Sequence, residues 1–312
     1  MAEAGRNKKN GLIELFRFLC SVWVVYYHGF FPILSDEFRG AVISVDFFFM
    51  VSGLFFLKSI ESYREKRFLE GLRFILWARM KKIILPLLIS ALSILLCNLM
   101  FELDFGGFNW PLSFLWFFAA QFLFLALFYL LYKNIKRRFI FNIVCVVIIL
   151  VFMSTFRLTS REFDRMFRGP AMVAMGILLS QIPRLRMNLK DKITAEKVSL
   201  VVNAVGFAIC ASAFIYLAYL PRFEIWKLHL QCCVVCPMML YFAKNLQVRS
   251  RLLNLLGELS VFIYLGQCPI LLHHYLVSQN TKDQFVPLCI CVVVMFLINR
   301  IFSAVRTKFK KA

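Results

Sequence analysis

The chain has 312 residues, and 61% of them are apolar, against about 45 to 50% in an ordinary soluble domain. Only 17% are charged, phenylalanine occurs 36 times, and apolar runs recur along most of the chain. This composition excludes a water-soluble globule and predicts an all-α, polytopic integral membrane protein. The formal charge of +20 does not indicate nucleic-acid binding, because the basic residues gather in the loops between apolar runs, as they do in cytoplasmic loops of membrane proteins.

Ten runs are long and apolar enough to be spanning helices, each of which needs about 20 mostly apolar residues. They cover residues 12–34, 41–57, 83–101, 111–132, 139–156, 169–182, 198–220, 226–243, 258–277 and 285–304. The second and sixth runs are short and contain glycine, so we expect them to be tilted, broken or partly re-entrant. The first run lacks a small-residue cleavage site and carries Glu14 and Arg17, which favours a retained span over a signal peptide.

The distribution of basic residues predicts the orientation. With the N-terminus inside, 28 of the 37 Lys and Arg residues fall in inner segments and 8 in outer ones, which places both termini in the cytoplasm. The whole chain, 1–312, then forms a single membrane domain with basic cytoplasmic tails at 1–11 and 305–312. The outer loop 157–168 is an exception with four arginines, which either contact an anionic glycan or lipid head group or are simply solvated.

The longest inner loop, 58–82, is predicted to hold an amphipathic interfacial helix. Its apolar residues recur at helical spacing, and they are Phe68, Leu69, Leu72, Ile75 and Leu76. A helix with such a face lies in the plane of the membrane interface.

Ionisable side chains within spans are costly unless they are paired or face a wet cavity, so each is a functional candidate. Arg17 and His28 are eleven residues apart in the first span, which places them on one helix face about 16 Å apart along the axis. Asp46 falls at a depth similar to that of His28, and Ser52 and Gly53 lie about two turns deeper. A carboxylate beside an imidazole raises its basicity, as a general base requires.

Less specific interpretations remain open for these residues. Arg17 can reach the inner interface, and Asp46 and His28 can satisfy each other structurally. Gln121, Asn142 and Gln267 are expected to join helices by hydrogen bonds. We expect no metal site at His229 and the three nearby cysteines, because one straight helix cannot surround an ion tetrahedrally; the ten cysteines are expected to be buried small hydrophobes.

Three motifs, in this order, give the chain a resemblance to a known family. They are LFRFLCSVWVVYYH from Leu15, VDFFFMVSG around Asp46, and RMKKIILP before the third span. Together they resemble the membrane acyltransferase 3 family, bacterial enzymes that O-acylate cell-surface polysaccharides and related acceptors. The later segments FLWFF, FRGPAMVAMGILL and LGELSVFIYL are similar to that family too, so the resemblance spans most of the chain.

The resemblance implies roles for residues at matching positions. Arg17, His28 and Asp46 would be catalytic, while Arg79, Lys81 and Lys82 would hold the phosphates of the donor. Ser52, Gly53, Tyr27 and Gln267 are candidate pocket residues, with Ser52 serving either as an acyl-carrying nucleophile or in helix packing. Two positions depart from the family pattern: Lys82 replaces an arginine and loses its bidentate fork, and Gln267 stands where relatives commonly have histidine.

The implied activity is O-acyl transfer, most often O-acetyl transfer, in the cytoplasmic (inner) membrane. The donor is a cytosolic acyl-CoA, acetyl-CoA above all, and the acceptor is a hydroxyl of a cell-surface polysaccharide or a lipid-linked sugar; no cofactor is expected. The phosphates stay at the cytoplasmic face, and the acyl arm extends along the face from Arg17 to His28. The alternative from another class is a secondary transporter, which predicts internal repeats with interrupted spans; the chain has no convincing repeat.

Overall fold

The computed structural model describes residues 9–30, 42–63, 66–101, 109–135, 137–155, 161–185, 192–219, 229–277 and 292–301. All regular elements within these ranges are helical. They are α1 (Gly11–Phe30), α2 (Val42–Leu54), α3 (Phe56–Ile60), a 3-10 turn (Glu61–Tyr63), α4 (Phe68–Phe101), α5 (Asn109–Asn134), α6 (Arg138–Thr155), α7 (Arg161–Gln181), α8 (Lys192–Tyr219), a π-helical segment (Gln231–Val235), α10 (Cys236–Leu246), α11 (Arg251–Val277) and a final helix Val292–Ile301.

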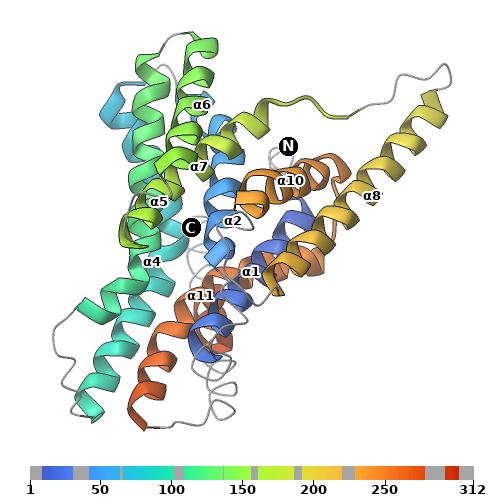
Figure 1. Cartoon of the computed structure of the whole chain (residues 1–312). Helices are drawn as coiled ribbons and strands as arrows, with labels where there is room; N and C mark the ends of the chain where they lie inside the picture. Colours follow the sequence, from blue (N-terminus) through green and yellow to red (C-terminus); the bar gives the residue numbers. More distant parts are fainter. Residues whose placement is uncertain are drawn as a thin grey trace, which may run out of the picture.

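The helices form a bundle in which α2 is central. Helices α4 to α7 stand together on one side, α1, α8, α10 and α11 lie on the other, and α2 lies between the two groups (Figure 1). The most extensive packing is between α1 and α11 and between α2 and α7. The core is rich in aromatic side chains from α2 and α5, including Phe47, Phe49, Phe124 and Phe128.

Each predicted span contains a helix, but several helix boundaries differ from the prediction. The second span is broken at Phe55, between α2 and α3, which is one of the three alternatives expected for this short run. The amphipathic segment of loop 58–82 is helical, but it is continuous with the third span in the 34-residue helix α4. The prediction for 157–168 was wrong in its described part, because α7 begins at Arg161 and this part of the expected loop is helix.

Two described helices are long and apolar enough to cross a membrane by themselves, within Phe117–Asn134 and Ile193–Leu217. Further described apolar helices of 10 to 17 residues lie in α2, α4, α6 and Val292–Ile301. Exposed leucine, isoleucine and valine side chains cover the outward faces of α6 and α8, as on a surface that meets lipid.

Glycine brings the backbones of α2 and α7 into direct contact. A Cβ atom at Gly53 would overlap the carbonyl oxygen of Val173, and one at Gly176 would overlap the carbonyl oxygen of Met50. Small residues permit this close approach, which drives helix association where the surroundings are as apolar as the helices. Gly53 therefore has a packing role.

Amide side chains join other helices, as expected for Asn142. The Gln181 amide of α7 donates to the Asn142 side-chain oxygen on α6 at 2.8 Å, and the Asn142 amide donates back at 3.1 Å. Asn245 of α10 donates to the Asn203 side-chain oxygen of α8 at 2.9 Å. At the start of α1, the Asn10 side-chain oxygen accepts from the Leu12 N–H at 3.1 Å as an N-cap.

We predict that Gly176→Ala lowers the midpoint of thermal unfolding of the detergent-purified protein. The new methyl group would meet the backbone of α2, and overpacking of this kind typically costs about 1–3 kcal/mol. Gly206→Ala is the matched control, because a Cβ there would meet only the end of the Phe242 ring, at 2.6 Å, which can rotate away. Equal midpoints for the two variants would contradict the close packing of α2 on α7.

Candidate functional site

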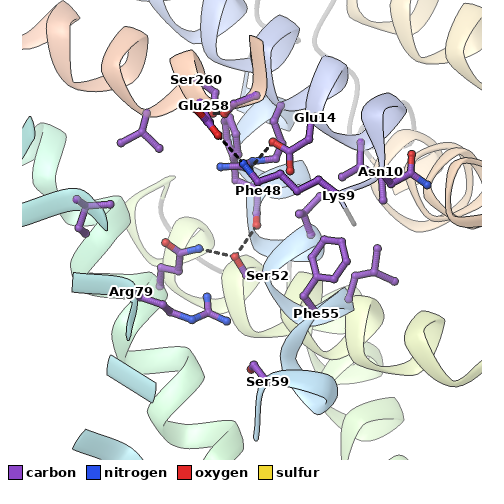
Figure 2. A pocket seen from close by; sticks show the side chains of 18 of the residues that line it. Lys9, Asn10, Glu14, Phe48, Ser52, Phe55, Ser59, Arg79, Glu258 and Ser260 are labelled. Atoms are coloured by element: carbon purple, nitrogen blue, oxygen red, sulfur yellow. Dashed lines mark hydrogen bonds and ion pairs between the residues drawn. The ribbon is translucent and has the colours of Figure 1, made fainter. Parts of the chain in front are cut away.

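A cavity of about 2030 Å³ opens among α1, α2, α4, α5 and α11 (Figure 2). Among the described residues that line it, ten are Lys or Arg and three are Glu. The basic ones are Lys9, Arg17, Lys58, Arg79, Lys81, Arg138, Arg184, Lys244, Arg249 and Arg300. Seven of them lie within three residues of a helix end, whereas Arg17, Arg79 and Lys81 lie further inside α1 and α4. Lys9 and Arg300 both pair with Glu258, and Lys244 bonds to the end of α7, so these helix ends and their positive charge gather at one end of the bundle.

Further along the helices the cavity wall becomes aromatic. Phe48, Phe117, Phe118 and Tyr264 line it there. The Phe117 ring lies 5.9 Å from that of Phe48 and 5.5 Å from that of Tyr264, measured between ring centroids. The cavity therefore changes from strongly cationic at one end of the bundle to apolar near mid-helix.

Arg79 points into the cavity from α4 (Figure 2). No described side chain forms an ion pair or a hydrogen bond with its guanidinium. Burial lowers the pKa of Arg79 to about 10, so the group remains positive at neutral pH. Lys81 also lines the cavity, with its ammonium 5.3 Å from the centroid of the Trp77 ring. A partly buried cation with no partner among the described side chains is suited to hold an anionic ligand.

Other cations of the cavity are already engaged by the protein. The Lys244 ammonium donates to the carbonyl oxygens of Leu179, Ser180 and Ile182 at 2.8 to 3.2 Å, which satisfies the last carbonyls of α7. Burial and, secondly, the nearby Arg184 guanidinium lower the pKa of Lys244. Lys244 is thus a helix cap, whereas the Arg79 guanidinium has no partner among the described side chains.

Arg17 is held by a carboxylate of its own helix. Its guanidinium donates to Glu14 Oε2 at 2.9 Å, three residues earlier. Glu14 is buried against Gly257 of α11, where any larger side chain would overlap the carboxylate. Arg17 is 26% exposed, and both residues line the cavity.

Asp46 forms a buried ion pair that the sequence interpretation missed. Arg168 Nε of α7 donates to Asp46 Oδ1 at 2.7 Å, and the Cys232 thiol of the π-helical segment donates to Asp46 Oδ2 at 3.2 Å. The solvated or surface-binding role considered for Arg168 is wrong, because this residue is only 5% exposed. The sequence did contain a signal for this pair. Arg168 directly precedes the apolar run 169–182, and the helical spacing of that run continues back to Arg168, which favours a place for Arg168 in the helix.

The Ser52 hydroxyl makes two hydrogen bonds. Its hydroxyl donates to the Phe48 carbonyl oxygen at 2.9 Å and accepts from the Gln121 amide of α5. Gln121 thus joins two helices, as expected. No described carboxylate or imidazole hydrogen-bonds to Ser52, and its contacts are those of a serine used in packing.

Several predicted site residues lie outside what the structure describes. The backbones of Tyr27, His28, Lys82 and Gln267 are helical, but their side chains are outside the described part. Their assigned roles stay predictions. Among the described residues, no group of three His, Cys, Asp or Glu side chains could hold a metal ion.

Comparison with protein families gives a match over nearly all of the chain. A model of the acyltransferase 3 family, described as an acyltransferase domain, matches residues 10–303, nearly the whole chain. Comparison with curated proteins and with solved structures finds no match.

We predict that Arg168→Gln and Asp46→Asn each lower the free energy of unfolding by about 3–5 kcal/mol, because each leaves a buried partner uncompensated. The double variant should lose less than the sum of the two. Denaturation of the purified protein measures these losses. Lys9→Gln is the control: it removes an exposed pair with Glu258, of a kind that contributes about 0–1 kcal/mol. Arg168→Gln as stable as the control would exclude a structural role for the pair.

Proposed function

The chain belongs to the acyltransferase 3 family, and on that premise we propose that it transfers an acyl group from cytosolic acyl-CoA to a hydroxyl. The acyl group is acetyl, and the acceptor is a hydroxyl of a cell-surface polysaccharide or a lipid-linked sugar. The protein works in the cytoplasmic membrane as a multi-pass chain with both termini inside. Family membership establishes acyl transfer; the donor, the acceptor and the topology are our proposals.

Arg79 carries the proposal for the donor. It presents a guanidinium without a described partner to a cavity whose described lining has ten cations and three carboxylates. A phosphate satisfies such a guanidinium with short, charge-assisted hydrogen bonds. Lys81 and Lys82 follow on the same helix and would contact the remaining phosphate oxygens.

The distribution of charge supports delivery of the donor from the cytoplasm. Cytoplasmic loops are the basic ones in membrane proteins, and the cations of the cavity gather at one end of the bundle. The phosphates of CoA cannot enter hydrocarbon, so they stay at this end. The apolar part of the cavity then receives the uncharged arm of acyl-CoA, which joins the phosphates to the thioester.

His28 is proposed as the general base that takes the proton of the acceptor hydroxyl. Asp46 would orient it, even though both of its oxygens already accept a hydrogen bond, because each carboxylate oxygen has a second lone pair. Arg17, fixed by Glu14, would stabilise negative charge near the donor. The hydroxyl oxygen attacks the thioester carbonyl, the C–S bond breaks, and the CoA sulfur takes the proton from His28 and leaves as the thiol.

The acceptor is tested by analysing the surface glycan of cells with and without this protein. Ester-linked acetyl groups that are present only with the protein would support the glycan acceptor. A glycan that is unchanged, together with loss of acetyl from a lipid-linked sugar fraction, would assign the reaction to the lipid-linked intermediate.

We predict that His28→Ala reduces acceptor-dependent release of CoA by at least about 100-fold, the usual contribution of a general base. Release of free thiol by membranes that contain the variant is the measurement. The amount of membrane-inserted protein should equal that of the wild type. Full activity in this variant would remove His28 from the mechanism.

We predict that Arg79→Gln raises the apparent KM for acetyl-CoA by about 10- to 100-fold, as expected from the loss of a charge-assisted contact. The value of kcat should change much less. Arg73→Gln is the matched control, because Arg73 is an exposed arginine of the same helix that does not line the cavity. An unchanged KM in Arg79→Gln would reject the phosphate-binding role.

A further inference from the structure

Gln121 offers unused hydrogen-bonding groups to the cavity. Its amide carries two N–H donors and an oxygen with two lone pairs. One N–H donates to Ser52, and no other described group bonds to the amide. The Ser52 hydroxyl donates in turn to the Phe48 carbonyl of its own helix, and both of these residues are labelled in Figure 2. Ser52 uses its only proton within α2, so within the described part of the chain Gln121 is the member of the pair with a free donor and a free acceptor.

This polar pair lies one helical turn from the aromatic wall. Ser52 follows Phe48 by four residues on α2, and Gln121 follows Phe117 by four residues on α5. Across the two helices, Ser52 contacts Gln121 and Phe48 contacts Phe117. The polar layer is therefore about 6 Å, one helical turn, from the aromatic layer. The acyl donor therefore meets an amide before it meets the aromatic rings.

Arg79 and Gln121 lie at the same depth. Gly71 of α4 contacts Tyr129 of α5, where a larger side chain would overlap the tyrosine hydroxyl. From this contact α4 and α5 run antiparallel to each other. Arg79 lies eight residues after Gly71 on α4, and Gln121 lies eight residues before Tyr129 on α5, so both are about 12 Å from the contact in the same direction. Because both side chains line the cavity, a ligand whose phosphate pairs with Arg79 has the atoms next to that phosphate at the depth of Gln121.

Building on the proposed function, we infer that Gln121 binds an amide group in the uncharged arm that joins the phosphates of CoA to its thioester. An amide fits this side chain because it donates one hydrogen bond and accepts another, whereas a thioester carbonyl only accepts. From Ser52 to Asp46 is six residues, about 9 Å. That length accommodates the rest of the arm, so the thioester reaches the depth of Asp46 and His28.

Three ligands separate the parts of the donor in binding measurements on the purified, full-length protein. They are CoA, pantetheine, which keeps the amides but has no phosphate, and an oligoethylene-glycol thiol of similar length, which has neither. Gln121→Met should weaken CoA and pantetheine by the same factor, about 3- to 10-fold for one neutral hydrogen bond, and leave the glycol thiol unchanged. Arg79→Gln should weaken CoA alone.

Asn142→Leu is the matched control, because Asn142 is an interhelical amide that does not line the cavity; it should leave all three affinities unchanged. Equal losses for the glycol thiol and pantetheine in Gln121→Met would overturn the inference, as would pantetheine that does not bind the wild type when CoA does. Failure of the wild type to bind CoA at all would instead refute the proposed donor and hence the proposed function.

Discussion

Charged side chains inside a helix bundle this apolar must either meet a partner of opposite charge or face water. Three arginines satisfy this constraint in three ways. Arg168 is buried and paired with Asp46, and Arg17 is half-buried and paired with Glu14. Arg79 has no described partner and faces the cavity. The first two are fixed by the protein itself, and the third is available to a ligand, which is why the proposed donor site centres on it.

The short helix α2 connects these features. Asp46 anchors it to α7 through the ion pair, Gly53 brings it against the backbone of α7, and Ser52 joins it to α5. A helix of 13 residues has little surface with which to hold its position, so close backbone packing and a buried ion pair take the place of length. Its position in turn sets the shape of the cavity wall.

Much of the fold was predictable from the sequence because hydrophobic runs and helix periodicity are local properties. The runs locate the helices, and a break was one of the three alternatives expected for the short, glycine-containing second run, although its position at Phe55 was not predicted. The boundary of α7 was misplaced because Arg161, Arg165 and Arg168 were interpreted as loop residues, although arginine is compatible with a helix. Because Arg168 was assigned to a loop, it was not recognised as the partner of Asp46, from which it is 122 residues away in the chain.

The sequence by itself determined that this is a helical chain with an acyltransferase 3 signature and an excess of positive charge between its apolar runs. Only the tertiary structure decided which partners distant in sequence these charges meet: Asp46 pairs with Arg168 of α7, and the Lys244 ammonium caps the last carbonyls of α7. It also placed Gln121 beside Ser52 at the depth of Arg79. Composition and residue spacing depend only on neighbours within one helix. The pairing of side chains from different helices depends on which helices pack together, and contacts between segments distant in sequence determine that packing.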